Sequence, residues 1–316
     1  MADSNHPSVS VVIPTLNRAE YIGQAIRSVL EQNEPVSEIL VVDGGSTDAT
    51  REIAESFGAV IHWLPQEGKG AAGARNTGFR HARGSWIALL DSDDWWLKDK
   101  LRAQFYFLAR HPGVDFIFGD MALVEAGSDN DTPEILDASA HQYLVTNAGR
   151  LDGILEHLFR FNFVPTSSVL FRKSCLEKVG FMDETLQHCE DYDYWLKFAC
   201  RCRMGFVNQV LAKRRIHGGN TMRGAYLDNC EATLVVFDRM ESWVANAPAA
   251  VKQARLAGIS ATHNRLGGYC FKRRDYSKAH THLRAVWESG ILPQGIQNVK
   301  FFAKLFWAGT ARKLMN

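Results

Sequence analysis

The sequence has 316 residues, of which 46% are hydrophobic and 22% charged, and its 36 basic and 35 acidic side chains leave a net charge of +1. A chain of this length and composition can bury a full core, in one large α/β domain with an appendage or in two modest domains. The near balance of charge argues against a protein that binds nucleic acid through bulk positive charge, and we expect no nucleic-acid partner.

The first ninety residues alternate between strands and helices. Strands are predicted over 8–14, 38–42, 60–64 and 86–90, and helices over 21–31, 49–57 and 71–82. The strands are rich in β-branched residues and show no polar alternation, which is typical of parallel strands buried on both faces. This order predicts right-handed crossovers and a doubly wound sheet, in which ligands bind at the carboxyl ends of the strands.

The rest of the chain has a less regular middle and a helical end. Residues 126–140 predict a mobile surface loop, 162–172 a further strand, and 184–193 a polar segment that opens a helix. From residue 225 onward the pattern is helical, with two antiparallel helices over 267–273 and 276–287. The last segment, 296–316, is basic and aromatic; such a helix can lie on an anionic membrane or pack on its own domain, and both remain open.

An acidic run, Asp91-Ser92-Asp93-Asp94, directly follows the apolar residues 87–90. Three carboxylates at a strand end repel one another unless a cation or solvent screens them. Magnesium or manganese would do so and would keep coordination positions open for substrate phosphates. A solvated turn that caps the next helix is the alternative, but the run predicts a divalent metal site.

A second carboxylate, Asp43, ends a predicted strand just before Gly44 and Gly45. Glycines let a backbone approach a ligand closely, and a strand-end carboxylate can accept hydrogen bonds from a ribose or a base. A plain strand-to-helix connection remains the alternative. The absence of a G-x-G-x-x-G run disfavours a classical dinucleotide fold.

Two later clusters have weaker signals. Glu190 and Asp191 are adjacent carboxylates that could border an acceptor pocket, one of them as a general base. The alternative is an acid-rich helix N-terminus favoured by the helix dipole. Farther along, the run R-R-I-H-G-G-N has basic side chains beside glycines, which suit a pyrophosphate clamp, and His217 could ligate metal or contact phosphate. A lone histidine is, however, more often structural.

Together these segments resemble the inverting family-2 glycosyltransferases, which have a GT-A fold. The resemblance covers residues 8–221 and rests on six segments in order: S-V-V-I-P-T-L-N-R, V-V-D-G-G-S-T-D, G-A-R-N-T-G, D-S-D-D, H-C-E-D-Y-D-Y-W and R-I-H-G-G-N-T. It implies a nucleotide-sugar glycosyltransferase domain over 1–222, an α/β doubly wound mixed sheet flanked by helices, and a C-terminal helical region over 223–316. Many members carry a second acid where Gly44 stands, so the chain departs from the family there.

The resemblance also implies an activity and a site. It implies an inverting, metal-dependent transfer of a sugar from a nucleoside-diphosphate donor, by analogy a UDP-sugar, to a hydroxyl of a cell-surface polysaccharide or its lipid-linked precursor. The implied donor-binding residues are Pro14, Thr15, Asn17, Arg18, Asp43, Gly45, Arg75, Asn76, Asp91 and Ser92. Asp191 is the implied general base, with Glu190 and Trp195 on the acceptor side. Asp91, Asp93 and His217 are the implied ligands of Mn²⁺ or Mg²⁺.

The sequence disfavours three other functions. A phosphatase of the haloacid dehalogenase type also carries D-x-D after a strand, but normally near the N-terminus and followed by Thr or Val, whereas Trp95 follows Asp94 here. A sugar nucleotidyltransferase would need an early G-x-G-T-R-L type loop, which is missing. A non-catalytic nucleotide-sugar binder or assembly protein is disfavoured because both carboxylate centres are present.

The cysteines and the N-terminus bear on the compartment. The six cysteines form no paired C-x-x-C spacing, and free thiols in a reducing cytosol are the expected state. Residues 1–7 lack the basic and apolar regions of a signal peptide, and no apolar run approaches the ~20 residues of a membrane-spanning helix. We therefore expect a cytoplasmic protein that could touch the inner face of the plasma membrane peripherally.

Overall fold

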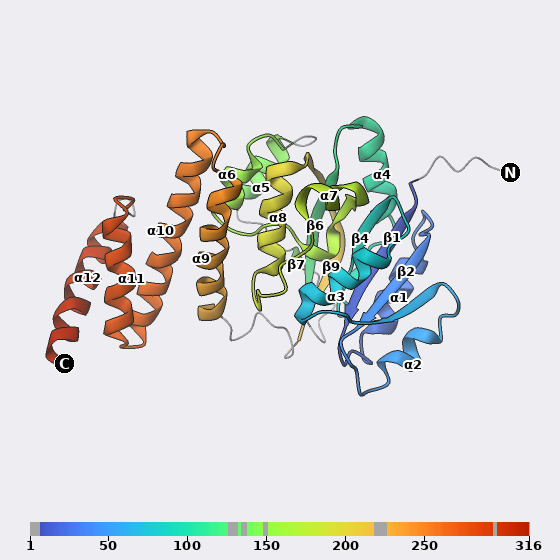
Figure 1. The fold of residues 1–316 in the computed structure, drawn as a ribbon, viewed down its shortest axis with the longest axis horizontal. Helices are drawn as coiled ribbons and strands as arrows, with labels where there is room; N and C mark the ends of the chain where they lie inside the picture. Colours follow the sequence, from blue (N-terminus) through green and yellow to red (C-terminus); the bar gives the residue numbers. More distant parts are fainter. Residues whose placement is uncertain are drawn as a thin grey trace. The chain divides into compact units, whose positions relative to one another are not determined.

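The computed structural model describes residues 7–125, 132–133, 138–147, 151–217, 226–292 and 296–315. The chain forms two compact units (Figure 1). The first comprises Met1–Ile154 and Phe163–Asn220, and the second Leu155–Asn162 and Thr221–Asn316.

The first unit is built on one mixed sheet. Among the described residues, nine strands pair in the order β3-β2-β1-β4-β8-β6-β9-β5, with β7 on β6. The strands are β1 (Val9–Thr15), β2 (Glu38–Asp43), β3 (Ile61–Pro65), β4 (Trp86–Leu89), β5 (Trp95–Trp96), β6 (Phe116–Glu125), β7 (Thr132–Pro133), β8 (Leu170–Arg172) and β9 (Met204–Ile216). β1 to β4 run parallel, β8 is antiparallel to β4 and β6, and β9 runs parallel to β6.

Helices flank this sheet (Figure 1), except α6 in the following list, of which all but the first residue belongs to the second unit. They are α1 (Ile22–Leu30), α2 (Thr50–Glu55), α3 (Gly70–His81), α4 (Lys100–Arg110), α5 (Ala138–Thr146), α6 (Ile154–Leu158), α7 (Leu176–Val179) and α8 (Glu190–Arg201), with 3-10 turns η1 (Thr166–Ser168) and η2 (Lys173–Cys175). The predicted α/β class, a doubly wound mixed sheet flanked by helices and followed by a helical region, is confirmed.

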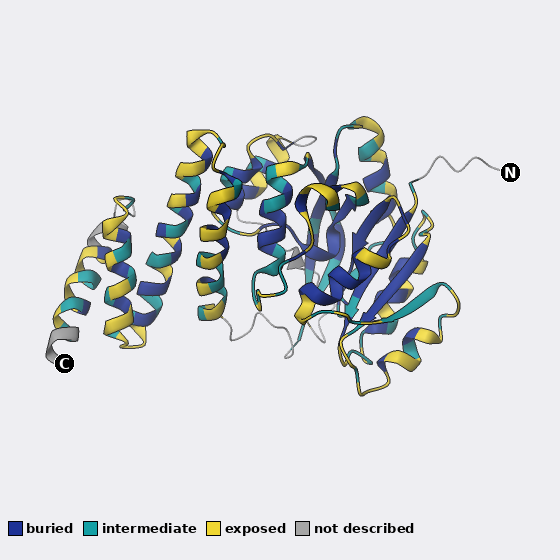
Figure 2. Cartoon of the chain, viewed as in Figure 1, coloured by how far each residue is buried: buried dark blue, intermediate teal, exposed yellow. Residues whose placement is uncertain are grey.

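The burial of the central strands explains why the first strands could be predicted from the sequence. Val9, Val11, Val12 and Ile13 of β1 are fully buried, and Figure 2 shows the central strands as the buried part of the unit. Burial on both faces requires apolar residues at consecutive positions, which is the pattern of the sequence. The sheet thus forms a rigid support for the loops at its carboxyl edge.

The carboxyl ends of three strands meet at one edge. Thr15 at the end of β1 is in register with Asp43 at the end of β2, and β4 pairs with β1 on its other side. Helix α3 lies against β1 at close range, because a Cβ at Gly78 would sit 2.3 Å from a methyl of Val12. The absence of a side chain at Gly78 therefore lets α3 approach the sheet.

The strand predicted over 162–172 is wrong for most of its length. Only Leu170–Arg172 is a strand, and Thr166–Ser168 is a 3-10 turn. Pro165 has no N–H to give to a ladder, and the Ser168 side chain bonds instead to the Pro165 carbonyl and the Gly119 amide. Of the predicted loop over 126–140, the part that the structure describes contains β7 and the start of α5; the rest lies outside the described residues.

The second unit is helical, as predicted. Its helices are α9 (Tyr226–Trp243), α10 (Ala249–Lys272), α11 (Tyr276–Glu288) and α12 (Ile296–Met315). The predicted short helix 267–273 is the end of the longer α10. The turn into α11 uses Arg274 at a φ of 65°, and Asp275 caps α11 by accepting from the Lys278 amide at 3.1 Å.

One segment falls in a different unit from the one the sequence suggested. The prediction places Leu155–Asn162 in the first domain, whereas the structure groups it with the C-terminal helices. The physical reason is packing: the Phe159 ring lies 5.3 Å from Phe237, and a Cβ at Gly258 would lie 2.2 Å from the Phe159 carbonyl oxygen. No helix in the described part of the chain is both long and apolar enough to cross a membrane.

Candidate active site

A buried arginine links two acidic segments at the carboxyl edge of the sheet. Arg75, on α3, donates to Asp91 at 2.8 Å and to Glu190 at 3.0 Å. Only 6% of its side chain is exposed. Burial alone would lower the pKa of Arg75, but the carboxylates of Asp91 and Glu190 outweigh it and raise that pKa. Arg75 therefore stays charged and holds the end of β4 to the start of α8.

The acidic run after β4 divides into different environments. The Asp91 amide donates to the Ser167 hydroxyl at 3.1 Å, and that hydroxyl donates to Asp94 at 2.6 Å. Burial, and then the charge of Asp91, raises the pKa of Asp94 well above its usual range. Asp94 is 3% exposed, whereas Asp91 and Asp93 are half-buried, so these two carboxylates border the site.

Asp93 and His217 come together from distant parts of the sequence. Nε2 of His217 lies 3.0 Å from Oδ2 of Asp93, and Nε of Arg18 lies 3.7 Å from the same oxygen. The His217 ring also packs on Tyr21, with ring centroids 4.8 Å apart. The glycine-rich residues that follow His217 lie outside the described residues.

Two loops at the strand ends hold each other in place. Asp43 accepts from the Ser46 hydroxyl at 2.6 Å, and Ser46 in turn accepts from the Asn17 amide at 2.8 Å. Asn17 has a φ of 51°, and its side chain accepts from the Thr47 amide at 2.8 Å. Gly45 adopts a φ of 101°, which lets the chain turn so that Ser46 faces Asp43.

The remaining predicted donor residues lie along this edge with different exposures. Thr15 is 5% exposed, and its hydroxyl is buried without a hydrogen-bond partner among the described residues. Pro14 precedes it and is half-buried, whereas Ser92, between the two carboxylates, is 5% exposed. A buried hydroxyl without a partner is uncommon in folded proteins, and it leaves Thr15 able to bond to a ligand or to water.

Asp191 occupies the first turn of α8. It accepts from the Tyr192 amide at 2.6 Å and from the Thr166 hydroxyl at 3.4 Å. Burial, and next the charge of Glu190, raises the pKa of Asp191 to about 6, although Arg75 opposes the shift. A carboxylate with this pKa is largely ionised at neutral pH yet a stronger base than an ordinary aspartate.

The residue before α8 has an unusual backbone. Cys189 has a φ of 60°, in the left-handed region that is rare for a residue with a side chain. Such strained positions are concentrated at functional sites. This turn sets the direction in which Glu190 and Asp191 leave the loop.

Two predicted site residues serve the fold instead. Asn76 is 1% exposed and its amide is fully used: it donates to the Met182 carbonyl and to Glu184, each at 2.9 Å, and accepts from the Met182 amide. Trp195 is fully buried, with its ring 5.3 Å from Phe116. Both side chains are therefore buried in the packing beside the site.

Sequence reasoning missed the residues that connect the site. Ser46 and Ser167 bond directly to the carboxylates, and Glu184 fixes Asn76. Ser46 lies in the V-V-D-G-G-S-T-D segment, three residues after Asp43, so its contact with that carboxylate could have been predicted. Ser167 had none, because its partners Asp91 and Asp94 lie 76 and 73 residues away in the sequence.

The predicted metal ligands Asp91, Asp93 and His217 suit a hard divalent cation only in part. In the described residues no three or more His, Cys, Asp or Glu side chains converge as a ready-made metal site. Asp93 and His217 do lie together, and one oxygen of Asp91 is bonded to Arg75. Oxygen ligands supplied by a bound diphosphate would complete such a site, as is usual for Mg²⁺.

Comparisons of sequence agree on one family. The model described as "Glycosyl transferase family 2" matches residues 10–178. An uncharacterized glycosyltransferase of Rickettsia typhi is 29% identical over 296 residues, covering 90% of this chain and 86% of its own. WfgD of Escherichia coli, named as a UDP-Glc:alpha-D-GlcNAc-diphosphoundecaprenol beta-1,3-glucosyltransferase, is 38% identical over 122 residues, or 38% of this chain and 48% of that protein.

Comparisons of structure show the same fold. TarS 1–349 of S. aureus, solved in complex with UDP, has a TM-score of 0.66 at 18% identity and covers 95% of this chain and 88% of its own. The mannosyltransferase PcManGT of Pyrobaculum calidifontis, solved with GDP-Man and Mn²⁺, has a TM-score of 0.58 at 20% identity, covering 98% of this chain and 81% of its own.

Proposed function

Because the chain belongs to glycosyl transferase family 2, we propose that it transfers a sugar from a UDP-sugar to an acceptor hydroxyl with inversion at the anomeric carbon. The observation that carries this proposal is the link made by Arg75. It ties the end of β4, where Asp91 and Asp93 would receive the donor diphosphate, to the start of α8, where Asp191 would meet the acceptor.

Asp191 is the proposed general base. An acceptor hydroxyl is a poor nucleophile, so a carboxylate that takes its proton during attack speeds transfer. Glu190 is the neighbouring candidate, but it is bonded to Arg75 at 3.0 Å, which weakens it as a base. Asp191 has the raised pKa of about 6 that suits this role. One base on the acceptor side is enough for inversion, and no enzyme nucleophile is needed.

Asp93, His217 and Asp91 are the proposed ligands of a divalent cation, Mn²⁺ or Mg²⁺. When bound, such a cation would neutralise the charge that builds on the leaving diphosphate. Arg18, 3.7 Å from Asp93, adds positive charge on the same side. The Mn²⁺ named in the PcManGT complex supports a metal in this fold.

The nucleoside is proposed to lie over the ends of β1 and β2. Asp43 would accept hydrogen bonds from it, and the buried Thr15 hydroxyl, which has no partner among the described residues, offers a further contact. Pro14, Asn17 and Gly45 would shape this part of the site through their backbone. The UDP in the TarS complex supports uridine as the nucleoside.

The proposed acceptor is a saccharide on a diphospholipid or a growing cell-surface polysaccharide. The name of WfgD supports this class, although that likeness covers 38% of this chain. Peripheral contact with the inner face of the plasma membrane would bring the enzyme to such an acceptor. Helix α12 supports this contact, because Phe306 is 78% and Trp307 51% exposed on a helix that also carries Lys300 and Lys304.

The test is a transfer assay with the purified chain. UDP-glucose, UDP-GlcNAc and GDP-mannose are each supplied with Mn²⁺ and a GlcNAc-diphospholipid acceptor, and the nucleotide released is measured. We expect UDP release that depends on acceptor, and a β-linked product from an α-linked donor by NMR coupling. A product with retained configuration, or no transfer from any of these donors, would contradict the proposal.

A further inference from the structure

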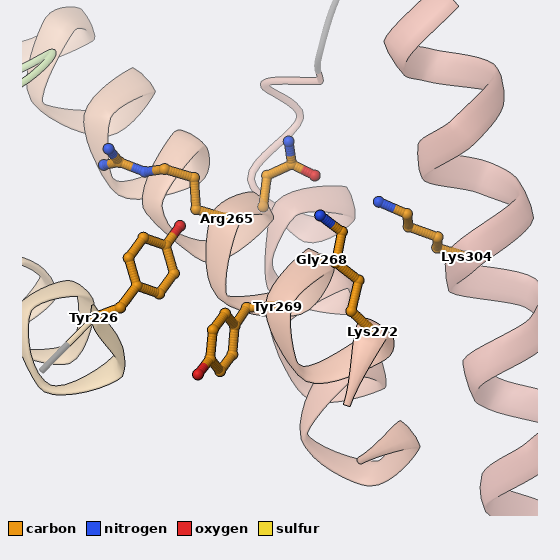
Figure 3. Close-up of a pocket in the computed structure, with 7 residues that line it drawn as sticks. Tyr226, Arg265, Gly268, Tyr269, Lys272 and Lys304 are labelled. Atoms are coloured by element: carbon orange, nitrogen blue, oxygen red, sulfur yellow. The ribbon is translucent and has the colours of Figure 1, made fainter. Parts of the chain in front are cut away.

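The second unit contains a pocket of its own, unrelated to the carboxylates described above. It has a volume of about 460 Å³, within the range of small-molecule sites, and lies among α9, α10 and α12 (Figure 3). Its lining residues are Tyr226, Asn264, Arg265, Gly268, Tyr269, Lys272 and Lys304. Three of these seven are cations and none is an acid.

Helix geometry brings the cations together. Arg265 and Lys272 are seven residues apart, so two turns of α10 place them on one face. Lys304 reaches the same space from α12: a Cβ built at Gly268 would lie 3.5 Å from its Nζ. Figure 3 shows Lys304 extending from its helix toward Lys272, which lies next to Gly268.

In the part of the chain that the structure describes, these cations have no acidic partner. Across the ranges that the structure describes, no carboxylate lies within 4.0 Å of Arg265, Lys272 or Lys304. Other cations of the same unit are paired, such as Arg255 with Glu241 at 3.3 Å and Arg284 with Glu288 at 2.7 Å. Three like charges around one pocket repel one another, and a bound anion would remove that repulsion.

The tyrosines add a second kind of contact. The rings of Tyr226 and Tyr269 lie 5.1 Å apart, both line the pocket, and Figure 3 shows them on the same side as Arg265. Their hydroxyls can donate to anionic oxygens, and their ring faces can pack on a sugar. The pocket thus combines fixed positive charge with an aromatic wall.

We propose that this pocket binds the phosphoryl group of a saccharide phosphate, either free or as a lipid headgroup. A phosphate carries up to two charges and three acceptor oxygens, which match three cations better than the single charge of a carboxylate. The proposed binding needs neither the donor nucleotide nor the metal, so it can be tested independently of the transfer reaction.

The test uses the full chain in EDTA, so that no divalent cation can hold phosphate at the carboxylate site. Glucose 1-phosphate and inorganic diphosphate are titrated by calorimetry. Co-sedimentation compares phosphatidylcholine vesicles with and without phosphatidic acid. The pocket variant is Lys272→Met with Lys304→Met. Its matched control, Lys252→Met with Lys278→Met, removes two exposed lysines of the same unit that do not line the pocket, and the same total charge.

The pocket variant should bind the phosphate probe at least about tenfold more weakly than the native chain, since it loses two charge-assisted contacts. The control should stay within about twofold, and arginine at both pocket positions should restore binding. Binding of glucose 1-phosphate assigns a soluble ligand, and binding only to vesicles with phosphatidic acid assigns a lipid headgroup. Equal losses in the two methionine variants, or no binding of any probe, would overturn the proposal.

Discussion

Arg75 donates to Asp91 at 2.8 Å from inside the protein, with 6% of the arginine side chain exposed and 30% of the aspartate. The same guanidinium donates to Glu190 at 3.0 Å, so one residue of α3 connects the strand end to α8. A buried cation between two carboxylates keeps both acidic segments in a fixed relation. The geometry of the site depends on this connection.

Replacement of Arg75 by Met should destabilise the protein strongly. It leaves two partly buried carboxylates without their cation, a change that costs about 3–5 kcal/mol in other proteins. Arg80→Met is the matched control, because its pair with Glu67 is 37% and 48% exposed and should contribute below about 1 kcal/mol. Urea unfolding followed by circular dichroism measures both. Equal losses would show that Arg75 does not carry this link.

Asp191→Asn should abolish transfer and spare donor binding. The amide cannot accept the acceptor proton, so kcat should fall on the order of 10²–10⁴-fold. The affinity for UDP with Mn²⁺ should change little. Asp193→Asn is a control on the same helix: it breaks the buried pair with Lys197 at 2.6 Å and should lower stability while leaving the chemistry intact. Turnover by Asp191→Asn close to that of the native enzyme would remove Asp191 from the reaction.

The pH profile of kcat/KM should fall on the acid side near pH 6. A general base works only when it is unprotonated, so activity is full above the Asp191 pKa of about 6 and decreases about tenfold per pH unit below it. Burial and then Glu190 raise this pKa, so Glu190→Gln should move the acid limb to lower pH. The exposed Glu67→Gln should leave the limb in place. An acid limb that Glu190→Gln leaves unmoved would argue for a different base.

Asp93→Asn should weaken the binding of UDP in Mn²⁺ at least about tenfold, because it removes a charged ligand from the proposed metal site. Binding in EDTA should be the same for this variant and the native chain. Asp99→Asn serves as control, since Asp99 is 53% exposed and pairs with Arg102 on the surface. If Mn²⁺-dependent affinity is identical in all three proteins, Asp93 is not a ligand.

Much of the sheet could be predicted because burial on both faces leaves a direct mark in the sequence. β1 and β2 are apolar runs, and their ends, Thr15 and Asp43, are readable as a ligand edge. β9 was not predicted, since its buried first residues are followed by exposed and half-buried ones. Its pairing with β6 also shifts register around Asp120, an irregularity that no local sequence pattern predicts.

The residues of the candidate site could be predicted from the sequence more readily than the contacts between them. The D-S-D-D run and Asp191 stand in short segments whose chemistry is local. Arg75 was expected to hold the nucleotide, yet its partner Glu190 is 115 residues away, and the packing of α3 against β1 and α8 brings them together. The burial of Asn76 and Trp195 could not be predicted, because polarity and aromaticity say nothing about which face of a helix is buried.

The most direct test of the account is calorimetric titration of the native chain with UDP, GDP and dTDP, each in Mn²⁺ and in EDTA. We expect UDP to bind in Mn²⁺ and EDTA to weaken this binding at least about tenfold, because Asp93 and the donor diphosphate would together hold the cation. UDP affinity that is the same with and without metal, or no binding of any nucleotide, would contradict it.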